Sequence, residues 1–112
     1  MARGVRPHHV KTEVSYPHII RPEAEADMTE GFQWYQERRD SLGFEFLGEI
    51  KTVLEKITEN PLRHAELYRS ARRSLVRRFP FAVIYIFESS KVEVIAAAHV
   101  KRDPKFWHRR VQ

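Results

Sequence analysis

The stretch RRSLVRRFPFAVIYIFESSKVEVIAAAHV, residues 72–100, decides the fold. Within it, residues 81–88 are rich in β-branched and aromatic side chains and are apolar on both faces, which indicates a central strand covered on both sides. Residues 89–91 are a turn signal, and residues 92–100 return as a second strand. Residues 72–78 form a shorter strand before both. The second half of the chain therefore predicts three short antiparallel strands.

Ahead of these strands, apolar side chains recur at helical spacing in two segments, residues 22–39 and 43–59. Pro22 occupies a natural first-turn position of the first helix, and the acidic residues near it complement the positive end of the helix dipole. The second helix ends at Asn60-Pro61. Because the connection between the two is short, we expect an antiparallel helical hairpin. The apolar stripes consist of Ala24, Met28, Phe32 and Tyr35 in the first helix and of Leu47, Ile50, Leu54 and Ile57 in the second, widened by Phe46 and Val53.

A further strand is predicted before the helices, because Val14, Tyr16, His18 and Ile20 alternate along the chain. Pro17 limits this strand to an edge of the sheet. The predicted order is β-α-α-β-β-β, an α+β fold in which the helical hairpin packs on one face of a small antiparallel sheet. The opposite face of the sheet is expected to stay partly open.

The last strand carries small side chains on one face. Val92, Val94, Ala96 and Ala98 alternate, so they are expected to share that face. The alanines leave room for a bulky element to pack closely, and we expect this element to be the helical hairpin.

Length and composition indicate one small globular domain. The chain has 112 residues, of which 42% are hydrophobic, enough for one core. We expect a single domain over residues 13–112, after a flexible lead-in at residues 1–12 where Gly4 and Pro7 break structure. The chain contains no cysteine, which excludes disulfides and favours the cytoplasm. No apolar run approaches the roughly 20 residues of a membrane span, so no membrane association is expected.

The net charge of +5 is unevenly distributed. Residues 13–60 carry five lysines and arginines against eleven acids, whereas residues 61–112 carry twelve against four, a net charge of +8. Two interpretations stay open: an anionic partner for the second half, or a solvated basic face. Under the first, the partner-binding or target-binding residues are predicted to gather on the open sheet face or its edge. They are Arg72, Arg73, Arg77, Arg78, Lys101, Arg102, Trp107 and Arg109.

Histidines at three positions raise the question of a metal site. His8, His9 and His108 have no acid or cysteine at the spacing of metal ligands, so no metal site is predicted. No cofactor is predicted either.

Five segments in this order resemble the RelE/ParE superfamily of toxins from bacterial type II toxin–antitoxin modules, often labelled plasmid stabilisation proteins. They are RPEAEADM, WYQERRDSLGFEFL, ITENPLRH, RRSLVRRFPFAVIYIFE and AAAHVKRDPKFWHRR. The resemblance covers roughly residues 14–110. It implies a cognate antitoxin whose acidic, flexible segment wraps the toxin in a hetero-oligomer, and this agrees with the basic second half. It also implies one of two cellular targets, since ParE-like members poison DNA gyrase and RelE-like members cleave messenger RNA in the ribosomal A site.

Two departures favour the ParE-like function. Where RelE-like enzymes carry a central strand arginine, this sequence has Ala82, and in place of their C-terminal tyrosine it has Trp107, whose indole is not a proton donor for catalysis. The resemblance therefore predicts a gyrase poison with no confident catalytic residue. The alternative is a metal-independent, ribosome-dependent endoribonuclease, in which His99 transfers protons and Arg73, Arg77 and Lys101 bind phosphate. A module that only binds its partner is the third possibility.

Overall fold

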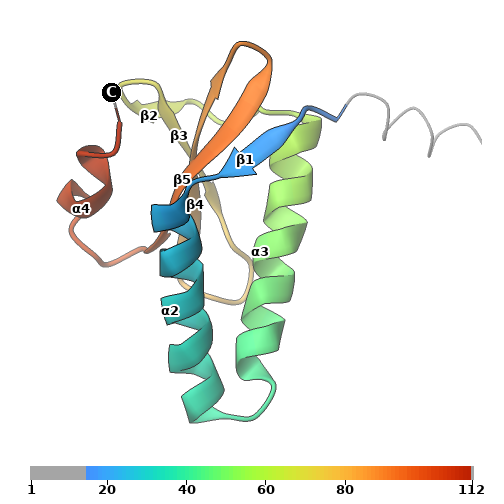
Figure 1. The fold of residues 1–112 in the computed structure, drawn as a ribbon, viewed down its shortest axis with the longest axis vertical. Helices are drawn as coiled ribbons and strands as arrows, with labels where there is room; N and C mark the ends of the chain where they lie inside the picture. The colour runs from blue at the N-terminus through green and yellow to red at the C-terminus, as the bar shows by residue number, and fades with distance from the viewer. Residues whose placement is uncertain (1–14, 112) are drawn as a thin grey trace, which may run out of the picture.

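The structure, a computed structural model, describes residues 15–111, so the predicted lead-in at residues 1–12 and Val14 of the first predicted strand lie outside the described residues. Helices α2 and α3 form the antiparallel hairpin and cover one face of a single sheet, while α4 lies to the side of α2 (Figure 1). The α+β fold with a helical hairpin on one sheet face is therefore confirmed. The elements are β1 (His18–Ile20), α2 (Pro22–Arg38), α3 (Leu42–Glu59), β2 (Glu66–Tyr68), β3 (Ala71–Leu75), β4 (Phe81–Glu88), β5 (Lys91–His99) and α4 (Lys105–His108).

The sheet is larger than predicted and is not wholly antiparallel. It has five strands in the order β1-β5-β4-β3-β2. The antiparallel β3-β4-β5 core is the predicted one, but β1 lies parallel to β5, with Ile20 opposite Val94. Strand β2 lies between α3 and β3, where no strand was predicted, and pairs with β3 at Glu66↔Arg72. It has three residues and no buried side chain, so it carries no hydrophobic alternation that a sequence pattern could detect.

Individual residues explain where the helical hairpin begins and where it turns. Pro22 is the first residue of α2, because a proline there loses no hydrogen bond, and Glu23 and Glu25 lie in the first turn. The connection to α3 passes through Ser41, whose φ of 74° is left-handed. The two helices approach closely at Gly43, where a Cβ would lie 2.6 Å from the Phe32 carbonyl oxygen. Glycine is therefore required at this crossing.

A β-bulge in β5 divides its side chains between two cores. Ile84 pairs with Ala96 and the next residue, Tyr85, pairs with Val94, so Ile95 has no partner on β4. The extra residue reverses the alternation: Val92 and Val94 join the core under the hairpin, whereas Ala96 and Ala98 join the core on the opposite face. The expectation that all four share a face is therefore wrong.

The C-terminal segment supplies the bulky element that packs over the small alanines. Trp107 is only 4% exposed and packs with Ala96, Ala98 and Val111 in the core of the face opposite the hairpin. That face is consequently more covered than the sequence predicts. Large aromatic side chains are efficient at filling such a space because each buries a large apolar area.

An ion pair between distant residues caps the edge of β5 beyond β1. Strand β1 stops at Ile20 because the chain turns into α2, which leaves backbone groups of β5 without a strand neighbour. Asp27 accepts the Ala97 N–H at 3.0 Å, and Arg110 donates to the Ile95 carbonyl at 2.8 Å. Asp27 and Arg110 also pair with each other at 2.8 Å, which fixes the C-terminal segment against α2.

Candidate functional site

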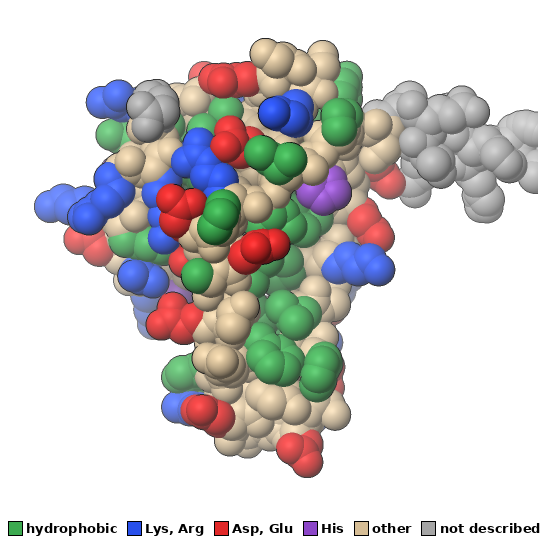
Figure 2. Space-filling model, in the orientation of Figure 1, with side chains coloured by type: hydrophobic (Ala, Val, Ile, Leu, Met, Phe, Trp, Pro, Cys, Tyr) green, Lys and Arg blue, Asp and Glu red, His purple; other side chains and the backbone are tan. Residues whose placement is uncertain are grey.

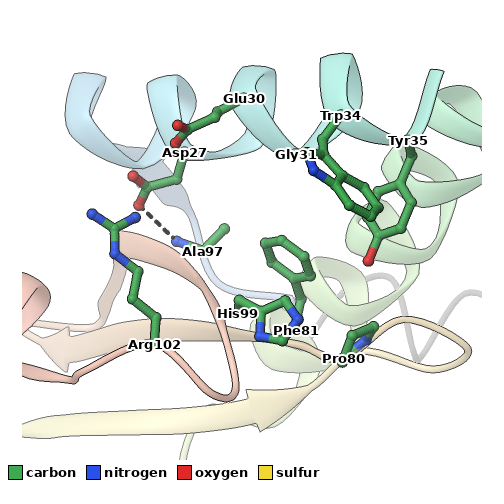
Figure 3. A pocket seen from close by; sticks show the side chains of 10 residues that line it. All are labelled: Asp27, Glu30, Gly31, Trp34, Tyr35, Pro80, Phe81, Ala97, His99 and Arg102. Carbon is green, nitrogen blue, oxygen red and sulfur yellow. Dashed lines mark hydrogen bonds between the residues drawn. The ribbon is translucent and has the colours of Figure 1, made fainter. Parts of the chain in front are cut away.

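Two hollows lie on either side of the segment that follows β5, and His99 and Arg102 line both. The first, here called the hairpin groove, has a volume of about 520 Å³ and lies between α2 and the ends of β4 and β5 (Figure 3). The second, here called the sheet-face pocket, has a volume of about 300 Å³ and lies on the sheet face opposite the hairpin. The groove is lined by Asp27, Glu30, Gly31, Trp34, Tyr35, Pro80, Phe81, Ala97, His99 and Arg102; the pocket by Leu67, Tyr68, Arg73, Ala82, Ile84, Ala98, His99, Val100, Arg102, Pro104, Trp107 and His108.

The sheet-face pocket combines an apolar floor with basic and aromatic walls. Ala82, Ile84 and Ala98 are buried and supply floor atoms from β4 and β5. On the wall from β2 and α4, the rings of Tyr68 and His108 stack at 3.7 Å with an interplanar angle of 1°. None of the described residues that line this pocket is a lysine or an acid. The pocket is therefore suited to an anion or a planar group.

The position of the proton on His99 is set by the backbone. The Lys101 N–H donates to Nδ1 of His99 at 3.1 Å, so in the neutral ring the proton is on Nε2. In this tautomer Nε2 donates a hydrogen bond to an oxygen and does not accept a proton. His99 is thus arranged to bind an oxyanion rather than to act as a general base.

Arg102 and Asp103 are held apart by the turn into α4. The guanidinium of Arg102 lies 3.7 Å from the ring centroid of Phe106, a cation–π contact. Asp103 accepts the Lys105 N–H at 2.9 Å and so stabilises the start of α4. Although Asp103 follows Arg102 directly, it forms no ion pair with Arg102 or with a strand arginine within residues 15–111.

The hairpin groove is aromatic at one end and charged at the other. Trp34, Tyr35 and Phe81 lie together at the end near Pro80, while Asp27 and Glu30 project from α2 above Arg102 (Figure 3). Trp34 is 51% exposed, which is unusual for so large an apolar side chain. Burial raises the pKa of the Tyr35 hydroxyl. The groove therefore offers an exposed aromatic surface beside a cation.

Comparison with known proteins identifies the fold. No protein-family profile and no curated protein matches the chain. A chain of the structure titled "Chromosomal ParDE TA system from P. aeruginosa" matches with a TM-score of 0.70 and 12% identity, over 78% of this chain and 98% of that one. A mutant of the E. coli toxin RelE in the free state matches with a TM-score of 0.55 and 10% identity, over 88% of this chain and 99% of that one.

The chain has the RelE/ParE-like fold.

Within this RelE/ParE-like fold, four of the predicted site residues come together. The pocket is lined by Arg73 from β3, His99 at the end of β5, Arg102 after β5 and Trp107 from α4. Trp107 does so as a largely buried core residue, with only its edge available. Lys101 is exposed beside the pocket, and its backbone rather than its side chain contacts His99.

The other predicted cations do not line this pocket, and for Arg72, Arg77 and Arg78 the expectation of one shared cationic surface is wrong. Arg72 alternates with Arg73 along β3 and turns away, where it pairs with Glu66 and donates to the His64 carbonyl. Arg77 faces α3 and the segment that follows α3. Arg78 has a left-handed φ of 71° and pairs with Glu45 and Glu49 of α3. Exposed Arg109 lies in a further basin, which Arg102 lines together with Arg21 and Phe106.

On the face that Figure 2 shows, lysines and arginines gather mainly on the side that carries α4, whereas the seam between the two long helices is largely apolar. This distribution agrees with the charge asymmetry of the sequence.

Within residues 15–111, no three histidines or acids lie close enough to hold a metal ion, and His8 and His9 lie outside the described residues.

Several residues of these sites were not predicted from the sequence. Asp27 is not among the predicted site residues, although it follows Ala24 by three positions and precedes Met28 by one, which places it on the buried face of α2. That spacing is a signal that was available. Tyr68 and Trp34 carried no usable signal, since their roles depend on which elements come together in the fold.

Proposed function

We propose that this chain is the toxin of a type II toxin–antitoxin module, held inactive by a cognate antitoxin. The observation that carries the proposal is the likeness of its fold to the ParDE and RelE structures over 98% and 99% of those chains. The basic second half of the chain supports an acidic partner, because such a surface attracts an acidic, flexible segment.

The hairpin groove is the proposed docking site for the antitoxin. An exposed Trp34 beside Phe81 gives an apolar anchor point, and Arg102 and His99 at its margin suit a carboxylate. A segment that carries one large apolar residue followed by acids would match both features. The toxin and antitoxin would then form a hetero-oligomer in the cytoplasm, where the proposed targets are found. No helix in the described part of the chain is both long and apolar enough to cross a bilayer.

We propose further that the toxin acts by binding its target, DNA gyrase, rather than by cleaving RNA. Three features support this: the floor of the sheet-face pocket is apolar at Ala82, the indole of Trp107 is buried, and Nε2 of neutral His99 carries a proton. A ribonuclease needs a base for the 2′-hydroxyl proton and an acid for the leaving oxygen. His99 is not arranged as that base.

A second candidate function, ribosome-dependent RNA cleavage, is favoured by one observation. The sheet-face pocket gathers Arg73, Arg102, His99 and the stacked pair Tyr68–His108. The arginines suit a phosphate, and His108 or Tyr68 could carry a proton. In this reading the phosphate-binding set is Arg73 with Arg102, because Arg77 lies outside the pocket and Lys101 directs only its backbone toward it.

Two assays on the same purified chain separate these functions. In the first, gyrase supercoils plasmid DNA with and without the protein; in the second, translating ribosomes are probed for cuts in messenger RNA. Gyrase poisoning without RNA cuts supports the favoured function, and codon-dependent cuts support the second. Inactivity in both assays, together with no growth arrest on expression, would refute the toxin proposal.

A further inference from the structure

A third hollow, which shares no lining residue with the other two, lies where α3, the segment after it and β3 converge. Its volume is about 170 Å³. Thr52, Val53 and Lys56 reach it from one stripe of α3, Arg63 and His64 from the following segment, and Ser74 and Arg77 from β3 and the residues after it. Three parts of the chain distant in sequence therefore build it.

The charges around this hollow are not balanced. Lys56, Arg63 and Arg77 are exposed, and none has a carboxylate within ion-pair distance in the described range 15–111. The only acid that lines the hollow, Glu49, already pairs with Arg78 at 3.4 Å. Three convergent cations without a partner repel one another, so an anion placed between them is attracted by all three.

The segment that carries Arg63 and His64 is anchored from the sheet. Arg72 donates to the carbonyl of His64, and the buried hydroxyl of Tyr85 donates to the carbonyl of Pro61 at 2.7 Å. These bonds hold the backbone on both sides of Arg63. A site whose backbone is already fixed loses less conformational entropy when it binds a ligand.

Two further donors complete the wall. Ser74 is a largely buried residue with a hydroxyl, and His64 is a half-buried imidazole. Burial, together with the nearby charge of Arg63, lowers the pKa of His64. The hollow is thus electropositive even with a neutral imidazole.

We propose that this hollow is an oxyanion site that takes a phosphate group. Two guanidinium groups and an ammonium, with a hydroxyl and an imidazole, offer more donors than the two oxygens of a carboxylate can use, whereas the oxygens of a phosphate can engage several at once. The site is independent of the toxin proposal, because it uses none of the residues of the groove or the pocket. A free phosphate and the phosphodiester backbone of a nucleic acid share this chemistry.

The test is a titration of the full ¹⁵N-labelled chain with inorganic phosphate, followed by amide NMR at constant ionic strength with chloride as the reference salt. Saturable shifts are expected at residues 63–64 and 74–77. Arg77→Gln and, separately, Lys56→Gln should each raise Kd about tenfold, as loss of a charge-assisted hydrogen bond does. Lys51→Gln is the matched control, since Lys51 is exposed on the opposite side of α3 from Lys56 and should leave Kd unchanged.

The same spectra report whether each variant is folded, so a lost interaction is not confused with a lost structure. Shifts that do not saturate, or that respond equally to Lys51→Gln and Arg77→Gln, would overturn the proposal. A second titration with a short single-stranded oligonucleotide without terminal phosphates distinguishes the sources: shifts at the same amides identify a backbone phosphate, and shifts with inorganic phosphate alone identify a free one.

Discussion

Asp27 and Arg110 are 83 positions apart in the chain and meet in an ion pair of 2.8 Å at the edge of β5. The pair does more than neutralise two charges, because each member also bonds a backbone group that the end of β1 leaves exposed. One contact therefore joins the hairpin, the bulge of β5 and the C-terminal segment.

Breaking this pair from either side should destabilise the protein strongly. The side chains are only 9% and 16% exposed, so Asp27→Asn or Arg110→Gln leaves a poorly solvated charge without its partner. We expect each to lower the free energy of unfolding by about 2–4 kcal/mol, measured by urea denaturation. The double variant should lose much less than the two single losses added together, since the second substitution removes the stranded charge. Strictly additive losses would show that the two residues act separately.

Trp107 should be essential for packing on the face opposite the hairpin. Replacing it with alanine removes the one buried aromatic ring of the core that contains Ala96 and Ala98 in the described part of the chain, and we expect a loss of about 3–5 kcal/mol. Trp107→Phe should lose less. Trp34→Ala is a suitable control, because that side chain is half exposed and its removal should change stability by no more than about 0.5 kcal/mol. Equal losses for Trp107→Ala and Trp34→Ala would contradict the assigned packing.

His99→Ala separates the two candidate functions in growing cells. If the toxin poisons gyrase by binding, growth arrest on expression of the variant should persist. If His99 transfers a proton during RNA cleavage, the cleavage rate on translating ribosomes should fall at least about a hundredfold, and growth arrest should weaken with it. His108→Ala is the companion variant, because it removes the other imidazole of the pocket and breaks the stack with Tyr68. Circular dichroism of both variants checks that the fold is intact.

The pH dependence of stability should contain a contribution from His64. Its pKa lies below the ordinary value of 6.5, because burial and the charge of Arg63 disfavour the imidazolium. As the pH falls through that value, the unfolded chain takes up a proton more readily than the folded one, so stability is complete above pH 6.5 and declines as the pH falls toward the folded pKa. His64→Gln should flatten the unfolding free energy between about pH 7.5 and 5.5. An unchanged slope would exclude this role.

Much of the fold could be predicted because its main elements have strong local patterns. Helix α3 has an apolar stripe ended by Asn60-Pro61, and β4 is a continuous run of β-branched and aromatic residues. Strand β2 could not be predicted, since it exists only through its pairing with β3. The bulge at Ile95 was equally invisible, because residues 94–98 are all apolar and no alternation marks the extra residue.

The candidate site was less predictable than the fold, for a reason that lies in strand geometry. Arg72 and Arg73 are neighbours in sequence, yet a strand directs them to opposite faces. Charge counts predicted a basic surface, but they did not predict that its lysines and arginines would line different hollows. The Asp27–Arg110 contact depends on the chain returning to α2 after more than 80 residues, and no local pattern records that return.

The bulge in β5 also has a consequence for local unfolding of the protein. The two cores lie on opposite faces of one sheet and share little beyond the backbone ladder of β4 and β5, and the bulge decides which side chains of β5 each core receives. Slow amide exchange should therefore fall into two groups, with the hairpin side as the more protected unit and the smaller C-terminal side exchanging through partial opening. A single extra residue in one strand would then decide how the side chains of β5 are divided between two regions that unfold with different free energies.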